Sequence, residues 1–340
     1  MKIKKIFSII VVTVLCGGKI NAQTTPANLT LSGTKTGNNE YEALNSIQST
    51  QVIHSGTTTY TAGNEIVLNP GFETEAGAEF EAVIEDVSNR LTVMTYNINR
   101  REYTKHAKVI KASGADVVAI QEVQSWPITD PNFAELKRET GFNGHMCNTY
   151  NYSPVFVYGI VLLWNDAKLG NPIAITDRVI NAPNATGNDD SKRGYIVAEF
   201  NDFCIVATHL PLNLVDNVSM SIEIIFDVNI NYQKPVFIAG DLNPSGGEPI
   251  NLLNLMSFEM LNYGDSTDEY YDKHATRTSG AQPDLIFWHN QNPNRDIIWN
   301  GVPECLWAPD TPNGYAGGIY KDWRFNISDH LPYVVKVKLK

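Results

Sequence analysis

Acidic and amide side chains follow apolar runs at several places in the second part of this sequence. Asn97 directly follows one such run, Glu122 follows a second after Gln121, and Asp241 and Asn243 come after a third. Apolar runs of this length are typical of buried strands, and functional groups gather where strands end. Asp241 and Asn243 are two positions apart, so they project to the same side of an extended chain. Each residue alone is explained by a turn or a cap, but an acid at such a position is also suited to bind a cation.

Two histidines and two further acids occupy similar positions. His209 ends the apolar run before it, and Asp284 stands at the start of another. Asp329 and His330 precede Pro332 and the last apolar run of the chain. A lone histidine is commonly a hydrogen-bonded structural residue, whereas an adjacent Asp and His just before a proline are uncommon in a simple loop. These residues therefore extend the set of candidate functional groups.

In their order and spacing, these segments resemble the endonuclease/exonuclease/phosphatase superfamily. The superfamily includes DNase-I-like nucleases, abasic-site endonucleases, neutral sphingomyelinases and inositol-polyphosphate 5-phosphatases. The resemblance covers about residues 90–340 and rests on TYNIN, QE, THL, GDLN, the acid of PDLIF and the final SDH. It implies an α+β domain, built as a four-layer α/β/β/α sandwich of the DNase-I-like type. It also implies an enzyme that hydrolyses phosphate esters with Mg²⁺, or alternatively with Mn²⁺ or Ca²⁺.

The resemblance assigns a metal site and a water-positioning site. Glu122 matches the principal metal carboxylate, Asn97 the asparagine beside it, and Asp329 an acid near the metal. Hard oxygen ligands of this kind suit Mg²⁺. Asp241 matches the acid that orients or deprotonates the attacking water, and Asn243 matches its phosphate-contacting neighbour. Asn97 is also a candidate for substrate contact.

The remaining catalytic candidates are histidines and their partners. By the same resemblance, His330 contacts the phosphate and works as a general acid or base, with Asp284 orienting it and favouring its charged form. His209 matches the second histidine of the DNase-like and sphingomyelinase-like branches. Arg193 and Arg277 are candidates for substrate contact, with a surface charge as the alternative explanation.

Two departures from the family pattern weaken the choice of substrate. Asn99 stands where many members carry an acid, Arg or His, and the Tyr or Glu of the middle strand has no clear equivalent, although Tyr158 lies near that place. We expect a phosphodiesterase, with an endonuclease of the DNase type favoured. Sphingomyelinase-like cleavage of phospholipids and inositol-phosphate-type phosphatase activity are the alternatives. A non-catalytic binding protein on the same fold is the alternative from another class.

The first 22 residues have the features of a signal peptide. Lys2, Lys4 and Lys5 precede a short apolar run, and Ala22 is a small residue suited to cleavage. Anchoring as a lipoprotein at Cys16 is disfavoured because the bulky Leu15 precedes it. We therefore expect a secreted or periplasmic protein without a transmembrane segment, acting as a monomer on a phosphate-ester substrate, either nucleic acid or phospholipid. Removing 22 residues with four Lys and no acid lowers the net charge from −11 to −15, which gives no overall attraction to nucleic acid.

Residues 23–88 differ in composition and are expected to form a small all-β repeat module. Residues 62–67 match residues 76–81 at an offset of 14, and residues 51–53 lie 14 positions before 65–67. Short strands at a fixed period predict a stack of small β-units, with an array of ordinary hairpins as the alternative. The segment resembles the coathanger-stack modules that precede catalytic domains in secreted bacterial proteins. None of its residues is a catalytic candidate.

Strands and helices alternate over residues 90–340, the expected catalytic domain. The predicted strands are 91–96, 116–120, 159–164, 195–200, 203–209, 235–239, 285–289 and 333–339, and the predicted helices are 103–113, 132–140, 216–232 and 249–257. A polar loop is expected after residue 164. Because some strand pairs are joined by hairpins, we expect a pair of mixed sheets with helices outside.

Three cysteines remain after the expected cleavage. Cys204 lies in an apolar run and is expected to be a buried thiol. Cys147 and Cys305 either pair or stay free, and the sequence leaves both alternatives open.

Overall fold

A computed structural model of the chain divides it into two compact units, Met1–Arg90 and Leu91–Lys340. The structure describes residues 26–87, 89–99, 103–125, 131–153, 156–184, 192–243, 253, 258–260, 284–289, 297–298, 304–305 and 332–339. The expected signal peptide lies outside these residues. Among the described helices, none is long and apolar enough to cross a membrane.

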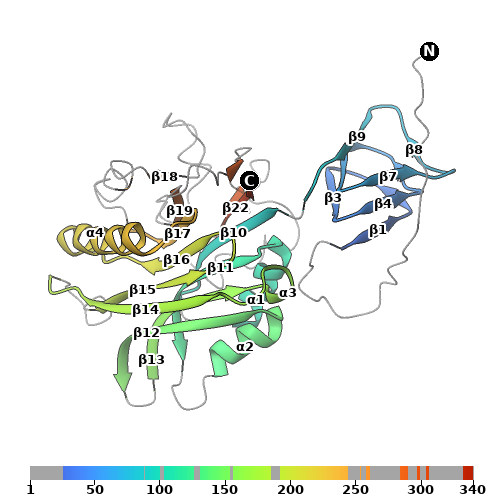
Figure 1. Cartoon of the computed structure of the whole chain (residues 1–340). Coiled ribbons are helices and arrows are strands. Elements are labelled where there is room, and N and C mark those ends of the chain that lie inside the picture. The colour runs from blue at the N-terminus through green and yellow to red at the C-terminus, as the bar shows by residue number, and fades with distance from the viewer. Residues whose placement is uncertain are drawn as a thin grey trace. The chain divides into compact units, whose positions relative to one another are not determined.

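The first unit is an all-β stack made of three parallel sheets with three strands each (Figure 1). Their strand orders are β1-β4-β7, β2-β5-β8 and β3-β6-β9. The strands are β1 (Asn28–Leu31), β2 (Thr34–Lys35), β3 (Asn39–Ala43), β4 (Ser46–Ser49), β5 (Val52–Ile53), β6 (Gly56–Ala62), β7 (Glu65–Leu68), β8 (Glu73–Thr74) and β9 (Ala78–Ile84). Three consecutive strands therefore make one rung, and the next rung stacks on it in parallel.

The predicted repeat length of 14 residues is wrong. Ile66 pairs with Ile47, and Tyr60 pairs with Tyr41, in each case 19 positions further along the chain. A rung must complete three strands and their corners before the chain returns to the same face. The apparent offset of 14 compares residues 65–67 of β7 with residues 79–81 of β9, which belong to different sheets.

The second unit contains two mixed sheets that face each other. The first sheet has the order β12-β13-β11-β10-β22-β20, with β21 beside β22, and the second has the order β14-β15-β16-β17-β19-β18. The strands of the first are β10 (Arg90–Asn97), β11 (Val117–Ser125), β12 (Asn143–Ser153), β13 (Phe156–Trp164), β20 (Ile297–Ile298), β21 (Glu304–Cys305) and β22 (Tyr333–Leu339). Those of the second are β14 (Ala174–Asn181), β15 (Lys192–Glu199), β16 (Cys204–His209), β17 (Val236–Asp241), β18 (Glu259–Met260) and β19 (Asp284–His289).

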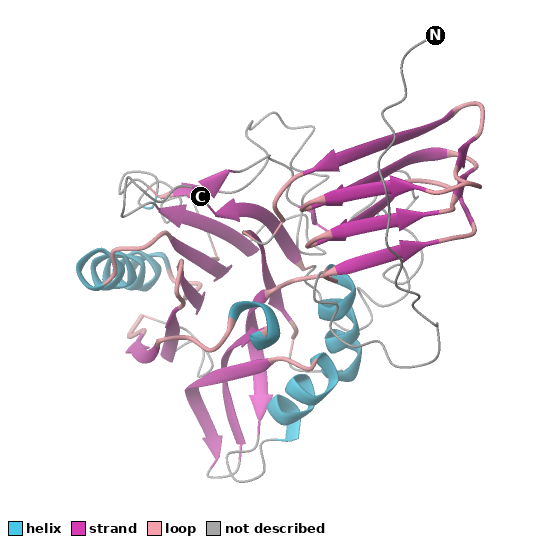
Figure 2. Ribbon diagram, turned by 45° about the vertical axis from the view of Figure 1, so that its right-hand side comes forward, coloured by secondary structure: helices cyan, strands magenta, loops and turns pink. Residues whose placement is uncertain are grey.

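Helices cover the outer faces of the two sheets (Figure 2). The helices are α1 (Tyr103–Ser113), α2 (Pro131–Thr140), the short α3 (Asp166–Leu169) and α4 (Leu214–Asn231). In α4, Met220, Ile224 and Val228 recur every four residues and pack with apolar residues of the second sheet. α1 connects the parallel strands β10 and β11, and α4 connects the parallel strands β16 and β17. The predicted four-layer α/β/β/α sandwich is confirmed.

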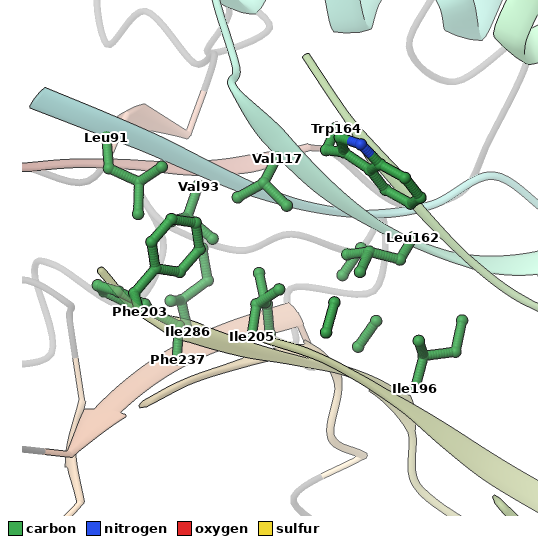
Figure 3. Close-up of a cluster of buried hydrophobic side chains, with 14 of the residues drawn as sticks. Leu91, Val93, Val117, Leu162, Trp164, Ile196, Phe203, Ile205, Phe237 and Ile286 are labelled. Carbon is green, nitrogen blue, oxygen red and sulfur yellow. The ribbon is translucent and has the colours of Figure 1, made fainter. Parts of the chain in front are cut away.

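The core of the second unit lies between the sheets (Figure 3). Leu91, Val93 and Val117 of the first sheet point toward Ile205 and Phe237 of the second. On each strand, alternate residues point inward, as the period of two of a strand requires. The core therefore consists of parallel rows of inward-facing apolar residues, one row from each strand.

Most of the predicted elements are present, but the long edge strands β12 and β14 and the two-residue strands β18, β20 and β21 were not predicted. Residues 174–181, within the expected polar loop, form β14, and residues 143–153 form β12. Both strands lie at the ends of their sheets. β14 is largely exposed, so its sequence lacks the apolar pattern on which strand prediction depends. The predicted helix over residues 249–257 lies almost wholly outside the described residues.

Candidate active site

The inward-facing rows change from apolar to polar at one end of the sandwich. On β16 the row continues from Ala207 to His209, and on β17 from Ala239 to Asp241. In the sheet His209 pairs with Asp241, and Asp241 pairs with Asp284, so the three residues lie side by side on adjacent strands. All three are buried. Polar groups held at the rim of an apolar interior are desolvated, which strengthens the electrostatic interactions among them.

Asn97 joins the two sheets at this end. It follows Val93 and Thr95 in the inward-facing row of β10 and is fully buried. Its Nδ2 donates to Glu122 Oε1 at 3.1 Å and to Asp241 Oδ2 at 3.0 Å, while its Oδ1 accepts from the Asn99 backbone N–H at 3.1 Å. One amide group thus brings together two carboxylates from different sheets.

Glu122 occupies a break in the regular pairing of β11. The register between β11 and β13 shifts between Ile120 and Val123, as in a β-bulge, and Glu122 has a left-handed φ of 58°. Among the described residues, Asn99, Glu122 and Asn243 are the non-glycine residues with positive φ. All three belong to the segments singled out from the sequence. Such backbone strain is typical of functional sites, where the surrounding structure holds it in place.

Asp241 is fixed in orientation from two directions. Its Oδ2 accepts from Asn97, and its Oδ1 accepts from the Asn243 backbone N–H at 3.1 Å. The preceding Gly240 permits close packing of β17 on β16, because a Cβ there would collide with the Thr208 carbonyl oxygen. Asn243, predicted to contact phosphate, has a φ of 42°, and its Nδ2 donates to the Leu210 carbonyl at 2.9 Å. In this arrangement, Asn243 ties the segment after β17 to the segment after β16.

His209 lies between Arg193 and Asp241. Its Nδ1 is 3.4 Å from Arg193 Nη1, and its Nε2 is 3.6 Å from Asp241 Oδ2. A guanidinium can only donate, so Nδ1 accepts and the ring proton is on Nε2, facing Asp241. This tautomer is inferred from the hydrogen-bond geometry. His209 is therefore placed to donate a hydrogen bond from Nε2 rather than to accept one.

Arg193 is buried in the site rather than exposed on the surface. Its Nη1 also lies 3.5 Å from the hydroxyl of Tyr158. Tyr158 belongs to the inward-facing row of β13 that continues with Ile160 and Leu162. The same alternation is visible in the sequence, but the pairing of β13 with β11 and β12 is needed to place Tyr158 beside Arg193.

Several predicted site residues lie outside the described part of the chain. These are Arg277, Asp329 and His330. Asp284 is fully buried and pairs with Asp241 across β17 and β19. Its assignment as the residue that orients His330 stays a prediction.

The described residues offer part of a site for a hard cation. Glu122 Oε1 and Asp241 Oδ2 converge on a single amide nitrogen, which places negative charge and oxygen donors together. Within the described residues, no group of three His, Cys, Asp or Glu is close enough to hold a metal. Rotating the Asn97 amide by half a turn would direct its oxygen, rather than its nitrogen, toward Glu122. That rotation would also break the bonds of Asn97 to Asp241 and to the Asn99 backbone N–H, so Mg²⁺ and its ligands Glu122, Asn97 and Asp329 stay predictions.

Cys147 and Cys204 are buried free thiols. Burial, followed by the influence of Asp177, raises the pKa of Cys147 to about 12. Burial, followed by the influence of Glu199, raises the pKa of Cys204 to about 12. The expectation for Cys204 is confirmed, and Cys147 does not form the disulfide that was one of its two alternatives.

No family model matches the chain, and no curated protein matches it in sequence. Solved structures do match. A functionally unknown conserved protein from Enterococcus faecalis V583 aligns with a TM-score of 0.53 and 17% identity, over 74% of this chain and 100% of that one. The human Nocturnin catalytic domain with bound sulfate anion aligns with a TM-score of 0.52 and 15% identity, over 74% and 95%.

A third matching structure is of a protein named for its superfamily. It is an endonuclease/exonuclease/phosphatase from Beutenbergia cavernae DSM 12333, with a TM-score of 0.50 and 18% identity, over 74% of this chain and 72% of that one. The second unit of this chain therefore has the DNase-I-like fold of the endonuclease/exonuclease/phosphatase superfamily.

Proposed function

We propose that the second unit is a metal-dependent phosphoesterase that cleaves phosphodiester bonds. The observation that carries the proposal is the amide group of Asn97, which joins Glu122 and Asp241 across the two sheets. A cluster of two carboxylates, a histidine and an arginine, all buried except the partly exposed Glu122, is costly to form and is typical of a functional site. The fold, which this chain shares with proteins named as phosphoesterases, adds support.

Each residue has a distinct part in the proposed reaction. Asp241, fixed by Asn97 and by the Asn243 N–H, accepts a hydrogen bond from the attacking water and directs it at phosphorus. The Nε2–H of His209 and the charge of Arg193 stabilise the negative charge on the phosphoryl oxygens. When bound, Mg²⁺ supplies further neutralisation of that charge, held by Glu122, Asn97 and Asp329. His330, oriented by Asp284, is proposed to hold or transfer the proton of the leaving group.

Nucleic acid is the proposed substrate, cleaved internally as by a DNase. His209, in the THL segment, supports this because its match lies in the DNase-like and sphingomyelinase-like branches. Human Nocturnin, whose catalytic domain has this fold, was solved with a bound sulfate anion, which has the shape of a phosphate group. The net charge of −15 after the expected cleavage of the signal peptide requires that local charges such as Arg193 attract the substrate. We further propose that the protein is exported, to the periplasm or the medium, and acts as a monomer.

A panel of substrates tests this proposal. Plasmid DNA, RNA, sphingomyelin vesicles and inositol phosphates are each incubated with the protein, with Mg²⁺ and with EDTA. We expect nicking of plasmid DNA in Mg²⁺ and none in EDTA. Cleavage of sphingomyelin alone would keep phosphodiester hydrolysis and replace nucleic acid by a lipid as the substrate. Cleavage of inositol phosphates alone would contradict phosphodiester cleavage and leave only phosphoester hydrolysis. Inactivity on the whole panel, or activity that EDTA leaves unchanged, would contradict the proposal.

The metal assignment has its own test within the panel. Glu122→Gln keeps the size of the side chain but removes its charge, so the Mg²⁺ concentration for half-maximal activity should rise about tenfold or more. Glu139→Gln, which affects a surface ion pair with Arg138, is the matched control. An unchanged Mg²⁺ requirement in Glu122→Gln would remove Glu122 from the metal site.

A further inference from the structure

Asn217 connects helix α4 to the two segments that follow β16 and β17. It lies in the first turn of α4 and is buried. Its Nδ2 is within hydrogen-bond distance of three backbone carbonyls, those of Pro211 at 2.9 Å, Leu242 at 2.9 Å and Asn243 at 3.2 Å. The Ser221 hydroxyl, one turn further along, donates to Asn217 Oδ1 at 3.5 Å. The amide of Asn217 is thus oriented by the helix and directed at the backbone beside the site.

The three carbonyls belong to the segments that carry the candidate catalytic side chains. Pro211 comes two positions after His209, and Asn243 comes two positions after Asp241. The two segments also bond to each other, since Leu210 N–H donates to the Asp241 carbonyl at 2.9 Å. That bond fixes their approach within the sheet. Asn217 adds a tie from the helix layer, outside the plane of the sheet, and limits how the segments tilt.

Formation of helix α4 does not explain why residue 217 is an asparagine. Asparagine has low helix propensity in a helix interior, and the N-cap of α4 is Asn213, whose Oδ1 accepts from Val215 N–H and Asp216 N–H. A leucine would fit the buried, mainly apolar face of α4 that carries Met220 and Ile224. The donors of Asn217 are therefore retained for the carbonyls that they satisfy.

We propose that Asn217 is a positioning residue that sets the separation of His209 and Asp241. It does so by clamping the backbone after β16 to the backbone after β17. His209 Nε2 and Asp241 Oδ2 are 3.6 Å apart, and a displacement of about 1 Å in such a site lowers turnover about 100-fold. The catalytic part of this inference rests on the proposed phosphoesterase function, whereas the clamping of the backbone does not.

The test compares Asn217→Leu with Asn213→Ala in the whole protein. The first removes the clamp and keeps the branching of the side chain at Cγ, and the second weakens the same helix at its cap without touching the three carbonyls. Hydrogen exchange is measured at the amides of Leu210 and Asn243, and kcat and KM are measured with bis(p-nitrophenyl) phosphate and Mg²⁺. If Asn217→Leu does not fold, Asn217→Ser, which keeps one donor, takes its place.

We expect exchange at both amides to rise about tenfold or more in the Asn217 variant and to stay near wild type in Asn213→Ala. The kcat should fall about 10- to 100-fold with KM within about threefold, because positioning affects the reacting groups more than binding. Unchanged exchange, or a kcat loss equal to that of Asn213→Ala, would overturn the inference. If the wild type is inactive on this diester and on the whole substrate panel while exchange rises as expected, the clamp is supported and the proposed function fails.

Discussion

Asn97 and Asp241 are 144 positions apart and lie on different sheets, yet Asn97 Nδ2 donates to Asp241 Oδ2 at 3.0 Å. The same nitrogen donates to Glu122. The contact forms where the apolar rows between the sheets end, so the packing of the sandwich places these polar groups together. The packing of the two sheets therefore determines both the stability of the core and the geometry of the candidate site.

Replacing Asn97 by Asp should destabilise the protein in the absence of metal. The change removes the shared donor and places a third carboxylate beside Glu122 and Asp241, at an expected cost of about 1–3 kcal/mol in the free energy of unfolding. Thermal unfolding in EDTA measures this cost. Adding Mg²⁺ should stabilise Asn97→Asp more than the wild type, because a bound cation offsets the added charge.

The control for this prediction is Asn201→Asp, a change of the same type in the exposed turn between β15 and β16. It should alter unfolding by less than about 0.5 kcal/mol. An Asn97→Asp variant that unfolds at the wild-type temperature in EDTA would show that the two carboxylates do not depend on the shared amide.

Gly240→Ala should destabilise the second unit through a direct clash. The added methyl group meets the Thr208 carbonyl oxygen on the neighbouring strand, and the strands would have to separate, at about 2–3 kcal/mol. Gly141→Ala is the comparison, because Gly141 has a positive φ of 77° but open space around it, and should cost about 1–2 kcal/mol. Urea unfolding of both variants gives the two values. Equal costs would mean that the close approach of β16 and β17 adapts to a side chain at position 240.

Arg193→Met should lower turnover while the fold persists. Arg193 is buried against His209 and Tyr158, so methionine fills most of its volume but removes the charge and the donor to Nδ1. We expect kcat on a phosphodiester to fall about 100-fold. Tyr158→Phe removes only the hydroxyl near Arg193 and should cost less than about tenfold. A normal kcat in Arg193→Met would restrict Arg193 to a structural role.

Cys147 and Cys204 should resist thiol reagents in the folded protein. Because burial raises the pKa of each thiol to about 12, both remain protonated at pH 8, whereas an unfolded thiol titrates near 8.5. The raised pKa values stabilise the fold below pH of about 8.5, and this stabilisation is lost progressively as the pH rises toward 12. Mass spectrometry after labelling with and without urea identifies which cysteines react. Labelling of either residue at pH 8 without urea would contradict their burial.

In the second unit, the sequence predicted those helices and strands in which burial of one face gives the apolar residues a regular spacing. The predicted helix over residues 103–113 coincides with α1, and the hairpin of β15 and β16 turns at residues 201–202 as expected. β14 was missed because it is largely exposed and carries no such spacing, and β12, which is partly buried, shows no regular apolar alternation in its sequence. In the first unit, the predicted repeat length was wrong because two other strands separate each strand from the one it pairs with. The short sequence matches at an offset of 14 lie between strands of different sheets.

The site was predicted as a set of residues but not as a geometry. Family-like spacing identified Asn97, Glu122, His209 and Asp241, and the structure brings these four together. The bulge at Glu122 depends on the pairing of β11 with β13. The sequence around Glu122 does not predict that pairing. The contact of Arg193 with His209 and the role of Asn217 depend on neighbouring strands and on the helix that covers them. Contacts of this kind follow from tertiary packing and carry no local sequence pattern.

Catalysis at the polar end of the sandwich is tested most directly by the turnover of Asp241→Ala on the phosphodiester that the wild type cleaves. Asp202→Ala, in the exposed turn before β16, serves as the control. We expect the kcat of Asp241→Ala to fall about 1,000-fold or more, with near-wild-type circular dichroism and an unaffected control. A rate within about threefold of the wild type would show that the polar end of the sandwich is not the place of catalysis.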